Sequence, residues 1–113
     1  MSAEQTQEEN VPVIYIGKKP LIRYVMAAMA IILNEAPKKL KISARGRAIS
    51  RAVDVAEVLR TRYLPGIIDV EDIKIGTDEI RNPQDPNRID RVSTIEITLI
   101  KKRDIVPTEA KSS

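Results

Sequence analysis

Two short basic segments have the composition of an anion-binding site, and each stands where an apolar, strand-like run gives way to a helical pattern. The first holds Lys18 and Lys19 before Pro20, and the second holds Arg45 and Arg47. The first turn of a helix carries unpaired N–H groups and a partial positive charge, so it favours Asp or Glu over cations, by roughly a few tenths of a kcal/mol. A phosphate bound by the same amides and cations would offset that loss. The two segments therefore predict phosphate binding.

The amino-acid inventory excludes much other chemistry. The chain has no Cys and no His, which removes disulfides, zinc-finger sites and the usual nucleophile and base pairs. The Gly-rich spacing of a nucleotide-binding loop is also missing around Gly17. A set of acidic residues in the third-strand region has the pattern of solvated charges rather than a metal site: Asp69, Glu71, Asp72, Asp78 and Glu79. We therefore expect no enzymatic activity, no metal and no cofactor.

Length and charge distribution point to one domain with an anionic partner. At 113 residues the chain suits a single core, and no apolar run approaches the roughly 20 residues that span a bilayer. Residues 17–62 carry eleven basic and three acidic residues, a net charge of +8, whereas residues 63–100 carry −4. We expect a domain over residues 11–103, tails at 1–10 and 104–113, and a soluble, cytoplasmic protein without a membrane partner.

Hydrophobic periodicity predicts six elements. They are a strand at 11–16 buried on both faces, a helix at 20–33, a strand at 39–44 with one solvated face, a helix from 48 to 63, and strands at 67–80 and 92–101. The second helix should bury the face with Ile49, Ala52, Val53, Ala56, Leu59 and Tyr63. A long polar loop at 81–90 should form the hairpin tip. The first helix is apolar over so broad a face that a second subunit could cover it.

The β-α-β-α-β-β order predicts an α/β fold of two layers with the helices on one face of the sheet. If the first two strands are parallel, right-handed crossovers place both basic segments at the same edge. Arg51, one turn further along the second helix, would extend the patch. Tyr15 and Tyr24 are expected in the core, which leaves little aromatic surface for base stacking.

A second interpretation, in which the cations have no binding role, stays open beside the functional one. Lys18 and Lys19 could be a solvated pair in a loop, and Arg45, Arg47 and Arg51 could form surface ion pairs with carboxylates of the second helix. The carboxylates in question are Asp54 and Glu57.

Four strings resemble Alba, a family of archaeal chromatin proteins. They are Ile14 to Pro20 (IYIGKKP), Ala44 to Asp54 (ARGRAISRAVD), Arg62 to Pro65 (RYLP) and Arg91 to Ile97 (RVSTIEI), within a resemblance that covers residues 11–102. The resemblance implies a fold like the C-terminal domain of translation initiation factor 3, with an extended hairpin arm between the third and fourth strands. It also implies a homodimer that binds double-stranded DNA and RNA without sequence preference.

Site residues carry over from the family onto matching positions. Lys18 and Lys19 would be the principal phosphate contacts, with Arg45, Arg47 and Arg51 beside them and Arg81, Arg88 and Arg91 on the arm. Lys18 matches the family's acetylated lysine, which implies a deacetylase as a further partner. Leu59 and Tyr63 would lie in an oligomer interface, Tyr63 where dimers associate on DNA. Pro83 and Pro86 leave the conformation of the arm tip open.

The resemblance thus implies a chromosome-associated protein of the nucleoid that packages and condenses DNA through phosphate contacts. A second interpretation is an RNA-binding ribonucleoprotein subunit or RNA chaperone, because the same basic edge would accept an A-form backbone.

Overall fold

The computed structural model describes residues 10–103, so the expected tails at 1–10 and 104–113 lie outside the described residues except for Asn10. The elements are β1 (Val13–Tyr15), α2 (Leu21–Glu35), β2 (Lys39–Arg45), a 3₁₀ turn (Gly46–Ala48), α3 (Ile49–Val58), a π-helical turn (Leu59–Tyr63), β3 (Ile68–Asn82) and β4 (Asp85–Lys101). The predicted β-α-β-α-β-β order is confirmed.

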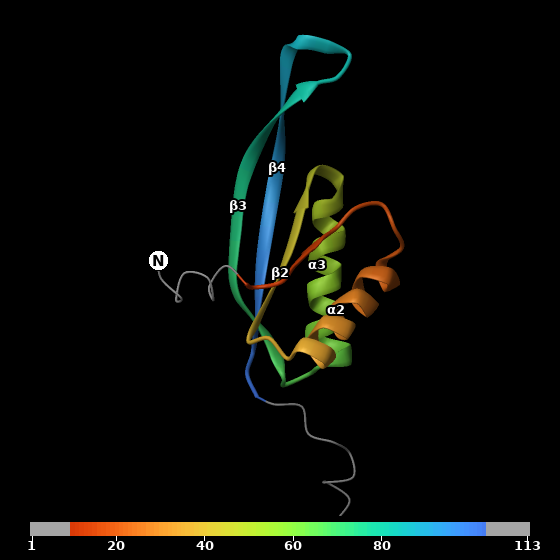
Figure 1. The fold of residues 1–113 in the computed structure, drawn as a ribbon, viewed down its shortest axis with the longest axis vertical. Helices are drawn as coiled ribbons and strands as arrows, with labels where there is room; N and C mark the ends of the chain where they lie inside the picture. The colour runs from red at the N-terminus through yellow and green to blue at the C-terminus, as the bar shows by residue number, and fades with distance from the viewer. Residues whose placement is uncertain (1–9, 104–113) are drawn as a thin grey trace, which may run out of the picture.

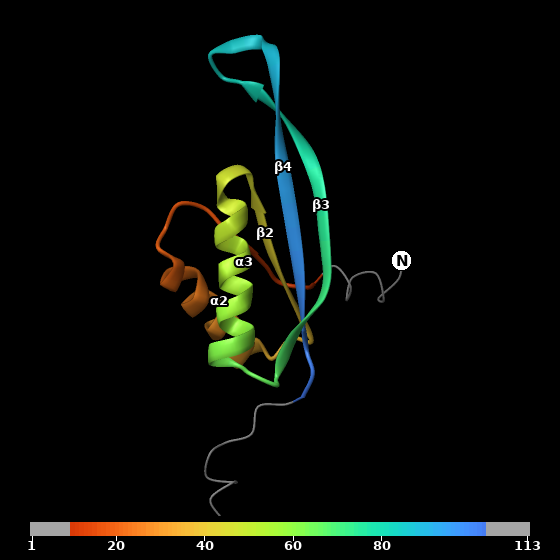
Figure 2. The same cartoon turned by 180° about the vertical axis from the view of Figure 1, so that it is seen from behind.

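The four strands form one sheet in the order β1-β2-β4-β3, with α2 and α3 together on one face (Figures 1 and 2). β1 and β2 are parallel, with Tyr15 opposite Ser43, and the other pairs are antiparallel. The parallel pair confirms the topology on which the convergence of the basic segments depends, because the carboxyl ends of β1 and β2 share one edge of the sheet.

The core lies between the helices and the inward face of the sheet. Strict alternation along β2 buries Leu40, Ile42 and Ala44 and leaves the intervening side chains on the opposite, open face. Helical spacing buries Tyr24 and Ala28 of α2 against them. Burial of these apolar side chains drives the two layers together.

The exposure of β1 differs from its prediction. Ile14 is buried, but Tyr15 is 74% exposed, so the expectations of a strand covered on both faces and of Tyr15 in the core are wrong. β1 is an edge strand, and the helices cover only one face of the sheet, so alternation places Tyr15 on the open face. The expectation for Tyr24 is confirmed, since it is 8% exposed.

The hairpin tip also differs from its prediction. Strands β3 and β4 continue through the segment 81–90 up to a turn at Pro83 and Gln84, so it is not a long loop, although residues 86–88 have no partner in the ladder, whose register shifts between Arg81 and Asn82. Residues 77–93 of the hairpin extend past Arg45, the last residue of β2 that pairs with β4, and are called the arm here (Figure 1). Polar composition suggested a loop, but a strand exposed on both faces needs no apolar alternation when its partner completes the hydrogen-bond ladder.

The buried face of α3 is rotated relative to its prediction. Ala52, Val55 and Ala56 are buried, whereas Val53, expected inside, is 41% exposed. Val53 and Val55 flank the shared stripe of Ala52 and Ala56 on opposite sides, and periodicity does not decide which side the rest of the core covers.

Candidate nucleic-acid interface

The first basic turn is held in shape by a buried tyrosine. The hydroxyl of Tyr24 accepts hydrogen bonds from the backbone N–H of Gly17 at 2.9 Å and of Lys19 at 3.0 Å. A Cβ at Gly17 would lie 3.3 Å from the same hydroxyl, so glycine allows this close approach. Since these two amides are already paired, the Lys18 and Lys19 side chains, both exposed, are left to contact a ligand. A phosphate would thus be bound here by ammonium groups more than by the backbone.

The second basic turn depends on a left-handed glycine. Arg45 is extended, with φ −141° and ψ 154°, and Gly46 follows at φ +62°. A side chain at position 46 would be strained by that φ, and its Cβ would lie 3.3 Å from Val92. The reversal at Gly46 leaves Arg45 and Arg47 exposed on either side of the turn.

The two basic turns are linked by Arg51, whose Nη1 donates a hydrogen bond of 3.1 Å to the carbonyl oxygen of Gly17. A depression of about 480 Å³ opens between the turns, lined by nine residues that include Lys18, Arg45, Arg47 and Arg51. Lys19 lines a neighbouring depression of about 600 Å³ beside Tyr24. The tertiary structure thus brings together cations that are up to 33 residues apart in the sequence.

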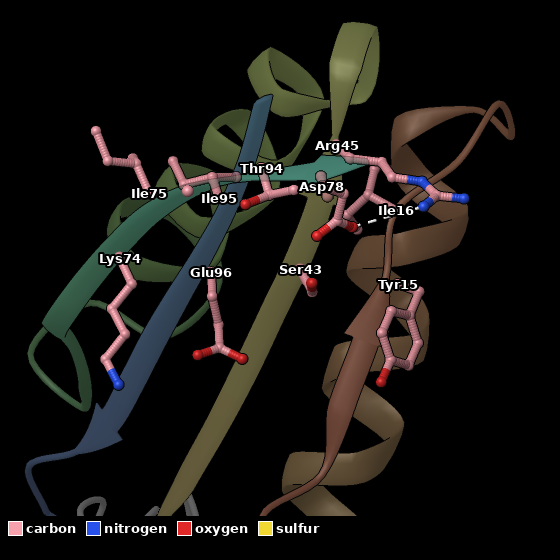
Figure 3. Close-up of a pocket in the computed structure, with 12 residues that line it drawn as sticks. Tyr15, Ile16, Ser43, Arg45, Lys74, Ile75, Asp78, Thr94, Ile95 and Glu96 are labelled. Carbon is pink, nitrogen blue, oxygen red and sulfur yellow. Dashed lines mark ion pairs between the residues drawn. The ribbon is translucent and has the colours of Figure 1, made fainter. Parts of the chain in front are cut away.

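The contacts of Arg45 and Glu57 differ from the ion pairs that the alternative interpretation of the cations allowed. Arg45 lies 3.6 Å from Asp78 at the base of the arm, and both side chains are more than half exposed (Figure 3). Glu57 pairs instead with Arg60, at 2.7 Å. Exposed pairs of this kind contribute about 0–1 kcal/mol, so a phosphate can compete for Arg45.

The arm arginines contact groups on the arm itself. Arg88 lies 2.9 Å from Asp90, and Arg91 lies 3.4 Å from Glu79. Arg81 donates to the backbone carbonyl of Pro86 across the tip. Three arginines and four carboxylates give the arm a net charge of −1, so the arm does not continue the basic surface of the two turns.

The two expected interface residues differ in exposure. Leu59 is fully buried in the core of this chain, so its side chain has no exposed surface that a second subunit could contact. This corrects the expectation for Leu59. Tyr63, in the π-helical turn Leu59–Tyr63, is 40% exposed.

The acidic residues of the third-strand region are exposed, and several meet cations. Glu71 lies 3.0 Å from Lys39, in addition to the pairs of Asp78 and Glu79. Between Asn10 and Arg103, no group of three or more Asp or Glu side chains is arranged to hold a metal ion. Neither of the two described helices is long and apolar enough to cross a membrane.

Comparison with known proteins places this fold and these turns in a family. The sequence model of the Alba family matches residues 12–77, more than half of the chain. The chain belongs to the Alba family. The "DNA/RNA-binding protein Alba" of Nanoarchaeum equitans is 52% identical over 91 residues, covering 80% of this chain and 99% of that protein. "DNA/RNA-binding protein Alba 1" of Archaeoglobus fulgidus is 48% identical over 89 residues, covering 79% and 94%.

Two solved structures have the same fold as this chain. Alba from Thermoplasma volcanium superposes with a TM-score of 0.69 at 39% identity, covering 78% of this chain and 98% of that one. ALBA1 from Trypanosoma brucei superposes with a TM-score of 0.61 at 22% identity, covering 79% and 68%, and shares the fold.

Two features of this Alba protein escaped the sequence analysis. Tyr24 is a core residue, as predicted, yet its hydroxyl also positions the first basic turn. A tyrosine one helical turn after a Gly-Lys-Lys-Pro segment was the available signal. Asp78 had no signal, because its contact with Arg45 joins residues that are 33 positions apart across the sheet.

Proposed function

We propose that this chain binds DNA and RNA through their phosphate backbones, with Lys18, Lys19, Arg45, Arg47 and Arg51 as the contacting cations. The observation that carries the proposal is the depression between the two basic turns, which four of these side chains line. The names of the two curated Alba relatives, both DNA/RNA-binding proteins, support it further. Arg81, Arg88 and Arg91 would add contacts along the arm once a phosphate displaces their exposed partners.

Sequence-independent binding and DNA packaging follow from the kind of contact. Cations on phosphates position a protein on nucleic acid but carry no base information. A protein of this kind coats or condenses the chromosome, which predicts a place in the cytoplasmic nucleoid. Lys18 is exposed in the first turn and lines the depression between the two turns, so its acetylation would remove a central charge, and a deacetylase would restore it.

A homodimer is supported by apolar surface beside α3. Ile73 and Ile75 pair across the ladder with buried Ile97 and Ile95, so they share the inward face of the sheet, yet they are 54% and 82% exposed. A second copy that covered them would double the basic surface. Sedimentation at micromolar concentration should give a dimer for the natural chain and a monomer for Ile75→Lys. Exposed Tyr63 remains available for association between dimers.

The salt dependence of DNA affinity tests the proposed function. With about six to ten phosphate contacts per dimer, affinity should fall by roughly 10³ to 10⁵ between 50 and 200 mM salt. Lys18→Ala/Lys19→Ala should lower affinity equally for unrelated duplex sequences. Lys38→Ala is the control, because Lys38 is an exposed lysine before the opposite end of β2. An affinity that is indifferent to salt, or a loss confined to one DNA sequence, would contradict the proposal.

A further inference from the structure

Tyr15 is an exposed aromatic side chain next to the basic turns. It is 74% exposed at the carboxyl end of β1, two residues before Gly17. Together with Lys18 and Lys19, Tyr15 lines the depression of about 600 Å³ described above. Tyr15 and Lys18 are three residues apart, no more than about 11 Å along the chain. A large apolar ring in contact with water so close to the cations is not explained by the fold.

Tyr15 also borders a second, larger depression on the open face of the sheet. This depression has a volume of about 680 Å³ and extends from β1 to β3. A single row crosses the four strands, with Tyr15, Ser43, Glu96 and Lys74 in register (Figure 3). The row offers an aromatic ring first and then a hydroxyl and a carboxylate, which are groups that stack on a base and hydrogen-bond its edge.

The charges on the open face suit a base better than a phosphate. Carboxylates accompany the cations along β2 and β3 there: Lys39 pairs with Glu71, Lys41 with Glu96 at 3.8 Å, and Lys74 lies opposite Glu96 in the ladder. Because carboxylates accompany the cations there, a phosphate is favoured at the basic turns, while an uncharged ring can occupy the sheet. This division fits a nucleotide whose phosphate lies at Lys18 and Lys19 and whose base lies over Tyr15.

We propose that Tyr15 is a stacking platform for an unpaired base, which gives this chain a binding mode for single-stranded RNA beside its duplex mode. The proposal rests on the proposed function, since the basic turns supply the phosphate contact. A base held within a duplex presents no free face to Tyr15, so the ring contributes only to the binding of single-stranded nucleic acid. Base stacking on an aromatic residue is sequence-tolerant, in keeping with phosphate-directed binding.

The test compares an unstructured RNA strand with a DNA duplex of equal length. Tyr15→Leu should lower affinity for the strand by roughly 5- to 100-fold and leave duplex affinity unchanged, while Tyr15→Phe keeps the strand affinity. Fluorescence of 2-aminopurine in the strand should be quenched by the natural chain and by Tyr15→Phe, but not by Tyr15→Leu. Thermal unfolding confirms that the variants are folded, as expected for so exposed a side chain.

The outcomes separate this inference from the proposed function. Unchanged strand affinity in Tyr15→Leu would overturn the stacking role, and so would an equal loss on strand and duplex. Neither result affects phosphate binding by the turns. If instead Lys18→Ala/Lys19→Ala leaves both ligands bound as before, the proposed function itself fails.

Discussion

Arg51 of α3 donates a hydrogen bond of 3.1 Å to the carbonyl oxygen of Gly17, the residue that opens the first basic turn. The contact joins the helix that follows the second turn to the start of the first turn. Arg51 therefore has two physical roles, as a cation of the patch and as a link that holds the two turns at a set spacing. An arginine suits both, since its guanidinium has five N–H donors and one bond leaves others for phosphate.

Arg51→Ala should weaken DNA binding by more than the charge alone accounts for. One lost phosphate contact corresponds to about fivefold in affinity at 0.15 M salt. Loosening of the first turn adds to this, so the amides of Gly17 and Lys19 should exchange faster with solvent. Hydrogen exchange and DNA titration measure the two effects. Arg51→Lys, which retains the charge, should restore the salt slope, and unchanged amide exchange in Arg51→Ala would refute the linking role.

Tyr24→Phe should destabilise the fold by about 1 kcal/mol, because two turn amides lose their acceptor while the ring stays packed. Urea unfolding measures the loss. DNA affinity should also fall, since Lys18 and Lys19 are carried by the turn that the hydroxyl holds. Tyr63→Phe is the matched control, because Tyr63 is an exposed tyrosine away from this turn. Equal stability of the two variants would show that the hydroxyl of Tyr24 contributes nothing.

Asp78→Asn should raise DNA affinity several-fold. The change removes an anion 3.6 Å from Arg45 and frees that guanidinium for phosphate. Glu71→Gln alters the net charge equally but removes the partner of Lys39, at the other end of β2 from Arg45, and should have a smaller effect. Titration of both variants with one duplex at fixed salt distinguishes a local release of Arg45 from a general change in charge. Equal gains would favour the general change.

Ala36→Gly should stabilise the protein by about 0.5–1 kcal/mol. Ala36 ends α2 in the left-handed region, at φ 48° and ψ 49°, where a Cβ is unfavourable and glycine is not. The larger unfolded-state entropy of glycine reduces the gain. Thermal unfolding measures the difference. Ala27→Gly, on an exposed position inside the same helix, should lose about 1 kcal/mol, and a loss at position 36 as well would contradict the argument.

The sequence by itself determined the order of the elements and, given a parallel pairing of the first two strands, the edge at which the cations gather. These follow from local periodicity and from the handedness of βαβ crossovers, which need no knowledge of distant contacts. The Gly-Lys-Lys-Pro and Arg-Gly-Arg segments lie together at that edge, and their binding role belongs to the proposed function.

Only the tertiary structure decided which faces are covered. Alternation along β1 assigned Tyr15 to one face, but whether that face is buried depends on helices that pack on the other side of the sheet. Periodicity likewise placed Val53 on the buried face of the second helix, but the packing of α3 leaves it 41% exposed and buries Val55 instead. The contact of Arg45 with Asp78 depends on β4 lying between β2 and β3. Periodicity describes one element at a time, whereas burial and long-range ion pairs depend on how several elements pack together.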